Sequence, residues 1–257
     1  MKRGTRLTTV AVGAIVALVV AANPAWAAPA GIFTSSFADG PRRVDPIVSP
    51  GEQSDHEHCF YGVRGVTNTE TSASLRMKPS TWAVGDVDHS VFWIPCVYED
   101  GRLLPPATRY HFIAYYQSVA GTEQVPPENT AGVSTEMGYR CDIGGGVVTD
   151  LPPTTCSGTT LVLSGMMRGE RDLHLTEPFP KIRVFVRLDR GHSGRLGQIT
   201  VGGPAIGVDG EMGPNTVHFD YIWAWDREVF RQFLANCVRP DIPCGTNPRT
   251  QTFSSGT

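Results

Sequence analysis

Two short segments, far apart in the sequence, each carry a pair of metal-binding side chains two residues apart. His56 and His58 form the first pair, and His218 and Asp220 form the second. Side chains two apart on an extended strand point to the same face. If the two segments face each other, they supply three imidazole nitrogens and a carboxylate oxygen, a set that suits zinc, copper or manganese. We therefore predict a divalent metal held by His56, His58 and His218.

The histidines also have a structural interpretation. Histidine pairs at this spacing occur in buried hydrogen-bond networks that hold no metal. Cys59 directly follows His58, but the expected export of the chain favours a disulfide there over a thiolate ligand. A structural polar network is therefore the alternative to the metal site.

Carboxylates near these histidines are candidates for proton transfer. Asp220, Asp45 and Glu57 are the catalytic candidates, because metal-assisted reactions need a group that moves protons. On an ideal strand Glu57 points away from its two histidine neighbours, which argues against it. Asp55 and Asp226 add two more carboxylates. Any two of these five residues could instead provide the acid and the base for sugar hydrolysis, which depends on the distance between the carboxyl groups. Asp45 also precedes a proline, which is typical of a turn.

Alternating aromatic rings follow the second histidine motif. Tyr221, Trp223 and Trp225 fall on one face of an expected strand. Rings arranged in this way stack on sugars or fill a core, and the core is favoured. Together with Asp226 they are the substrate-binding candidates. Asp226 has a second interpretation as the N-cap of a helix.

The N-terminus has the three-part pattern of a secretory signal. Basic residues precede an apolar run from Leu7 to Ala22, and Ala25-Trp26-Ala27 resembles a cleavage site. The run is about 16 residues long, shorter than the roughly 20 that span a bilayer. We expect a secreted protein that is not held in a membrane after cleavage. The leader holds three positive and no negative charges, so its removal changes the formal net charge from −3 to about −6, which argues against a nucleic-acid partner.

All six cysteines follow the leader. An even number in an exported chain predicts disulfides rather than a cysteine-bound metal, and no C-x-x-C pair is present. The sequence alone leaves the pairing open. Short loops favour Cys141–Cys156 and Cys237–Cys244, which would leave Cys59–Cys96.

Short runs of β-branched and aromatic residues between glycine and proline turns predict a mainly β protein. Lys181–Asp189 is the clearest strand, because apolar and polar residues alternate along it. One helix is expected after Asp226, with an apolar stripe that ends before Pro240. We predict a single, disulfide-stapled β-sandwich or jelly-roll-like domain with one C-terminal helix. The expected divisions are a signal peptide at 1–27, an extended N-terminal arm at 28–43, the domain at 44–244 and a polar tail at 245–257.

Four motifs in order resemble a secreted family, the domain of unknown function nineteen ninety-six, which occurs in bacteria and fungi. The opening segment RVDPIVSPGEQSDHEHCFYG (Arg43–Gly62) and the closing segment HFDYIWAWD (His218–Asp226) are the specific ones. SVFWIPCVYEDG and EMGYRCDIGG lie between them. The resemblance implies that the family-type polar positions here are Asp45, Ser54, His56, His58, His218, Asp220 and Asp226.

The chain departs from the family pattern in its middle. There the family usually carries a cysteine-tryptophan-aspartate-glycine stretch and then a further histidine, whereas this chain reads MMRGERDLHL. Asp172 and His174 are the available substitutes. If the missing residues belong to the family's site, the site of this chain is reduced or altered.

The sequence gives two classes of function. The first is a secreted, metal-dependent enzyme that acts on cell-wall or extracellular polysaccharide. The second is a non-catalytic carbohydrate-binding protein or a structural envelope protein without a ligand. The export signal and the His/Asp motifs favour polysaccharide as the partner of the enzyme or the binding protein, and the resemblance adds an association with carbohydrate-binding modules.

Overall fold

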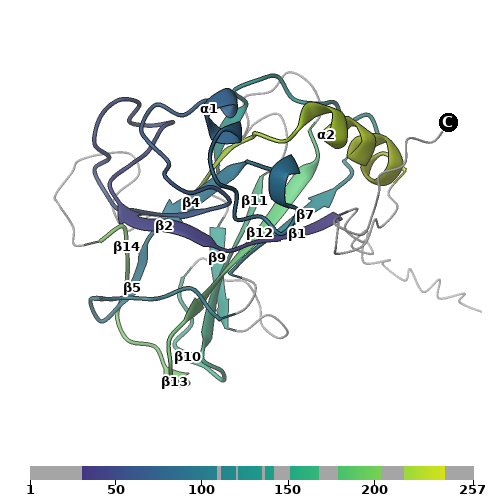
Figure 1. Cartoon of the computed structure of the whole chain (residues 1–257). Coiled ribbons are helices and arrows are strands. Elements are labelled where there is room, and N and C mark those ends of the chain that lie inside the picture. The colour runs from purple at the N-terminus through teal and green to yellow at the C-terminus, as the bar shows by residue number, and fades with distance from the viewer. Residues whose placement is uncertain are drawn as a thin grey trace, which may run out of the picture.

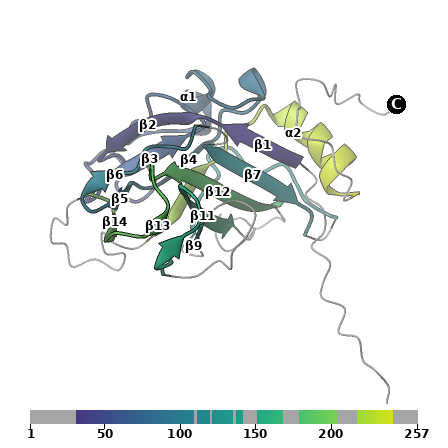
Figure 2. The same ribbon diagram turned by 90° about the horizontal axis from the view of Figure 1, so that it is seen from below.

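The computed structural model describes residues 31–108, 111–119, 121–134, 137–141, 151–167, 179–203 and 217–240. Two five-stranded sheets form the body of this part of the chain, and all the strand pairs described in them are antiparallel (Figures 1 and 2). The β1 sheet has the order β1 (Gly31–Ser35), β7 (Phe112–Gln117), β12 (Lys181–Asp189), β11 (Thr160–Met167) and β9 (Met137–Cys141). The β3 sheet has the order β2 (Phe37–Arg42), β3 (His58–Tyr61), β4 (Val91–Pro95), β15 (Phe219–Ile222) and β8 (Ala131–Ser134).

Two smaller sheets extend one end of this body. The first joins β14 (Ile199–Val201), β5 (Val97–Glu99) and β6 (Arg102–Leu103), and the second joins β10 (Thr155–Cys156) to β13 (Gly194–Arg195). The described helical elements are α1 (Ser72–Arg76), the 3-10 turn Gly85–Val87, α2 (Arg227–Phe233) and a π-helical turn over Leu234–Val238. The short α1 was not predicted.

The two large sheets share one apolar core. On β12 the predicted alternation is confirmed, because Ile182, Val184, Val186 and Leu188 are buried in that core. From the β3 sheet, Phe92 and Phe219 stack in the same core with ring centroids 5.3 Å apart. Burying both inner faces against each other is what makes two amphipathic sheets stable, so the predicted mainly β, sandwich-like class is confirmed.

The segment expected to form an extended N-terminal arm is extended, but it lies within both sheets. Gly31–Ser35 pairs with β7, and Phe37–Arg42 pairs with β3 after a single linking residue. Phe33 is buried and packs edge-on against Trp225 and Phe233. Residues 31–42 therefore join the edges of the two sheets.

Helix α2 lies next to β1 and β7, at the end of the body opposite β5 and β14 (Figure 1). Asp226 caps it by accepting hydrogen bonds from the amides of Glu228 and Val229, both at 2.9 Å. Phe230 and Phe233 bury its apolar stripe. The predicted C-terminal helix is confirmed.

Two of the three predicted disulfides are present in the described residues. Cys59–Cys96 and Cys141–Cys156 are both formed. The predicted Cys237–Cys244 pair includes residue 244, which lies outside the described residues, as do the predicted signal peptide, the polar tail, Asp172 and His174. In the part of the chain that is described, no helix has the length and apolar character needed to cross a membrane.

Candidate metal centre

The predicted histidine motifs meet on the outer face of the β3 sheet. Strand β4 lies between β3 and β15, and its Pro95 pairs with His58 while its Trp93 pairs with Asp220. Continuing the second register by two residues places His218 opposite Pro95 as well. The backbones of β3 and β15 are therefore about 9–10 Å apart, two strand spacings, and the two imidazoles meet above the short proline ring between them.

The three imidazoles point their Nε2 atoms at one another. His218 Nε2 lies 3.2 Å from His56 Nε2 and 3.2 Å from His58 Nε2. A tetrahedral ion bound at about 2.0–2.1 Å from each of two nitrogens would hold those nitrogens about 3.3–3.4 Å apart. The observed separations are close to those of neighbouring ligands on one ion, and they are also within hydrogen-bond distance, as the alternative of a polar network requires.

Two carboxylates complete the cluster. Asp220 Oδ2 lies 3.3 Å from His218 Nε2, and Asp45 Oδ2 lies 3.9 Å from His58 Nε2. One set of ligand atoms from His56, His58 and His218, and another from Asp45, His58, His218 and Asp220, each lie within 4.8 Å of one another. The first set offers three nitrogens and the second offers two nitrogens and two oxygens, and both sets fit zinc, copper or manganese.

The loop between β2 and β3 brings Asp45 and His56 to the sheet. Asp45 Oδ1 accepts hydrogen bonds from the amides of Ile47 and Val48, at 3.0 and 2.9 Å. Its other oxygen is left to face the histidines. Asp45 therefore stabilises the predicted turn with one carboxylate oxygen and faces the histidines with the other. Ser54, another position that the family resemblance implies, lies in the same loop and is buried.

Hydrogen bonds on the far side of two rings determine which nitrogen faces the cluster. His58 Nδ1 lies 2.9 Å from the carbonyl oxygen of Val44, and His56 Nδ1 contacts the carboxylate of Asp55. Each acceptor requires a proton on Nδ1, so each Nε2 presents a lone pair. Metal-binding histidines commonly have this arrangement, in which the outer partner orients the ring.

Burial disfavours charge on three members of the cluster, Asp45, His58 and Asp220. It raises the pKa of Asp220 well above its ordinary value, and the neighbouring Asp45 carboxylate raises it further. Burial also raises the pKa of Asp45, against the effect of its two amide donors and of the Trp93 indole, which lies close without making a full hydrogen bond. Burial, with repulsion from His56 and His218, lowers the pKa of His58 well below 6.5. A cation placed among these groups would reverse each penalty on the carboxylates.

Access to the cluster from solvent is narrow. His56 is 7% exposed, while the other two histidines and both aspartates are at most 2% exposed. Asp55, the outer partner of His56, is partly exposed. His56 is thus the most exposed of the five side chains in the cluster.

Several predicted site residues lie elsewhere. The Glu57 carboxylate accepts a hydrogen bond from the Tyr98 hydroxyl and lies beside Gly203, where a side chain would clash with it. This agrees with the expectation that Glu57 points away from its histidine neighbours. Asp226 is the N-cap of α2, which agrees with the second interpretation given for it from the sequence.

The predicted sugar-stacking role of the aromatic residues is corrected. Trp223, Trp225 and Tyr221 are each 0% exposed and lie in the shared core. Trp225 stacks on Phe233 with centroids 5.9 Å apart. Their alternation reflects the inner face of the sheet and the packing of α2, so they present no ring to a polysaccharide.

Sequence reasoning missed the groups that orient the histidines. Asp55 was considered only as an acid for sugar hydrolysis, although its position next to His56 could have suggested the contact. The Val44 carbonyl and the fit of Pro95 between β3 and β15 depend on strand register, which has no local sequence signal.

Comparison with known families now adds one finding. Residues 45–142 match the Domain of unknown function (DUF1996). This confirms the resemblance over a segment that includes Asp45, His56 and His58 but ends before His218. No curated protein and no solved structure matches the chain significantly.

Proposed function

We propose that this chain, whose residues 45–142 form part of a domain of unknown function, holds a divalent metal with His56, His58 and His218. The observation that carries the proposal is the convergence of three Nε2 atoms at 3.2 Å contacts, two of them oriented as lone pairs by outer acceptors. Asp220 and Asp45 form an overlapping group with His58 and His218 and would supply negative charge to balance a cation.

The leading use of such a centre is hydrolytic chemistry on cell-wall or extracellular polysaccharide. A metal bound by three histidines activates water and stabilises developing negative charge. If such an ion is bound, Asp45 Oδ2 and Asp220 are the candidate groups that would accept a proton from the activated water. The substrate class is supported by the expected export of the chain and by the associations of the family it resembles.

A structural metal is the second candidate. The observation in its favour is burial, since four of the five groups are at most 2% exposed. In that case the ion would fasten the loop that carries Asp45 and His56 to the β3 sheet. Chelation would then lower stability, because a ligand that binds only the folded state stabilises it by mass action.

Elemental analysis of the mature protein tests the metal. The protein is purified without a histidine tag from an exporting host, beside His56→Ala/His58→Ala and a matched control, His89→Ala/His192→Ala. The control removes two imidazoles that lie outside the cluster. We expect near-stoichiometric metal in the wild type and the control and its loss in the first variant. Wild-type protein without metal would overturn the proposal.

Activity and stability then separate the two uses. Metal-dependent release of sugars from cell-wall polysaccharides, abolished by chelation, would establish the enzyme. Stoichiometric metal without such activity, together with a large fall in melting temperature on chelation, would establish the structural role.

A further inference from the structure

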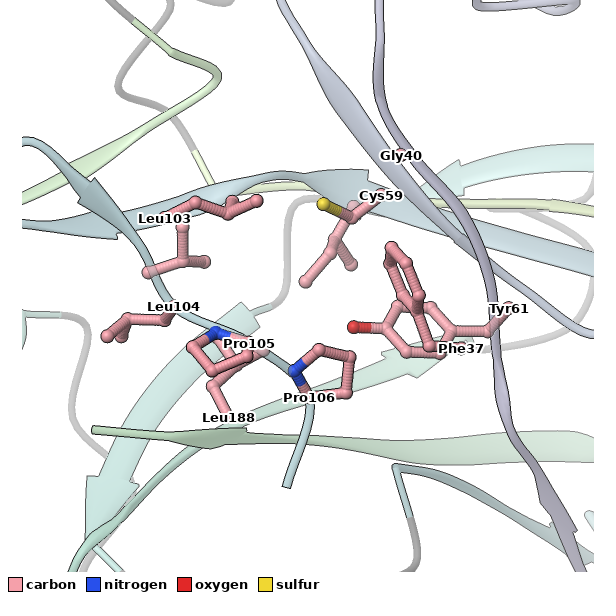
Figure 3. Close-up of a pocket in the computed structure, with 11 residues that line it drawn as sticks. Phe37, Gly40, Cys59, Tyr61, Leu103, Leu104, Pro105, Pro106 and Leu188 are labelled. Carbon is pink, nitrogen blue, oxygen red and sulfur yellow. The ribbon is translucent and has the colours of Figure 1, made fainter. Parts of the chain in front are cut away.

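A small apolar pocket lies on the other face of β3, away from the histidine cluster. Its walls come from both large sheets and from the segment Leu103–Pro106, and its volume is about 120 Å³. Figure 3 shows the side chains gathered around it, with the Tyr61 hydroxyl pointing among the leucine and proline side chains. Pro105 is exposed and marks the mouth.

The Tyr61 hydroxyl is the unusual group in this pocket. The side chain is 0% exposed, and its oxygen makes no hydrogen bond. The ring is fixed by stacking on Phe112, with centroids 5.3 Å apart, and by an edge contact with Phe37. Buried hydroxyls are almost always satisfied, so an acceptor from outside the chain is the expected partner.

Water fits this position poorly. A buried water normally makes about three hydrogen bonds. Apart from the disulfide sulfur of Cys59, the Tyr61 oxygen is the only polar side-chain atom among the residues that line the pocket. The lining also holds no charged group, which disfavours a carboxylate or an ammonium ligand.

We propose that this pocket binds a small, uncharged aromatic molecule or substituent that carries one oxygen, with phenol as its size and chemistry. An apolar cavity of about 150 Å³ is known to hold benzene, so a volume of about 120 Å³ with an open mouth suits a single ring. The rings of Phe37 and Tyr61 and the apolar side chains supply the contact surface, and the Tyr61 hydroxyl donates to the ligand oxygen.

Titration of the mature protein with phenol, toluene and benzoate, followed by NMR, tests the proposal. We expect phenol to shift the signals of pocket residues and to bind roughly tenfold more tightly than toluene, the difference made by one hydrogen bond. Benzoate should not bind. Tyr61→Phe keeps the ring and should remove the preference for phenol while toluene still binds.

A second variant keeps the test decisive. Leu103→Trp places a large side chain in the pocket from a half-buried position. It should abolish the binding of phenol and of toluene without changing the buried residues that pack against Tyr61. Equal phenol binding by wild type and Tyr61→Phe would overturn the proposal. So would the absence of phenol binding, or an ordered water alone on the Tyr61 oxygen in a crystal structure.

Discussion

At the scale of single residues, Asp220 is the member of the cluster whose environment most strongly disfavours a charged side chain. It is fully buried, and neither carboxylate oxygen accepts a hydrogen bond. His218 Nε2 lies 3.3 Å from Asp220 Oδ2. A buried carboxylate in this situation is unfavourable unless a proton or a cation neutralises it. This makes Asp220 the residue whose replacement best separates a metal site from a polar network.

We predict that Asp220→Asn weakens metal affinity by about 10- to 100-fold, the range seen when a group that tunes a metal site is removed. The metal-free variant should be no less stable than the metal-free wild type, because an amide avoids the buried charge. Competition with a chromogenic chelator measures the affinity, and urea unfolding in chelator measures stability. Asp226→Asn, which changes an exposed carboxylate at the helix cap, is the control. Unchanged affinity in Asp220→Asn would show that Asp220 does not face the ion.

At the scale of elements, sequence pattern predicted what depends on local periodicity. The alternation along β12 and the cap and stripe of α2 are set by neighbouring residues, and both are confirmed. The sheet membership of residues 31–42 was not predicted, because pairing partners are chosen by long-range burial rather than by local pattern. The alternation of the aromatic residues after His218 favoured the core over sugar stacking, and their burial agrees with that interpretation.

The candidate site was predictable in membership but not in geometry. His56 and His58 were expected to share a face of one strand, whereas β3 begins at His58 and His56 lies in the preceding bend. Their rings nevertheless lie 4.3 Å apart between centroids. The approach of His218 depends on β15 pairing with β4, a contact between residues more than a hundred positions apart.

The cap of α2 gives a prediction at this scale. Asp226→Ala removes two hydrogen bonds to free amides of the first turn and should lower the free energy of unfolding by about 1 kcal/mol. Urea denaturation measures this change. Asp226→Asn keeps an acceptor oxygen and should cost less. A loss of several kcal/mol would instead indicate that the substitution disturbs the packing of Phe230 and Phe233.

At the scale of the whole molecule, both faces of the β3 sheet are buried. Its inner face packs in the shared core, and its outer face carries a second apolar cluster that includes Phe60, Trp93 and Leu75. The histidine cluster lies at the border of that outer layer, under the loop between β2 and β3. When apolar layers cover both faces of a sheet, burial shifts the pKa of the polar groups near it. Asp88, outside the histidine cluster, is a further example.

Asp88 predicts how the stability of the fold depends on pH. It is fully buried, one oxygen accepts the Ser90 amide at 2.8 Å, and the other has no hydrogen bond. Burial raises its pKa from 3.8 to about 8. Between these values the folded state holds a proton that the unfolded state has lost, so the stabilisation present at low pH is lost as pH rises. The slope is on the order of 1.4 kcal/mol per pH unit.

Asp88→Asn isolates this contribution, because the amide keeps an acceptor for Ser90 and does not titrate. We expect the unfolding free energy of the wild type minus that of the variant to fall by about 2–3 kcal/mol between pH 5 and pH 7. Urea unfolding of both proteins in chelator at pH 5, 6 and 7 measures it, and contributions from the histidine cluster cancel in the difference. A difference that stays constant over this range would show that Asp88 is ionised in the folded protein, contrary to the prediction.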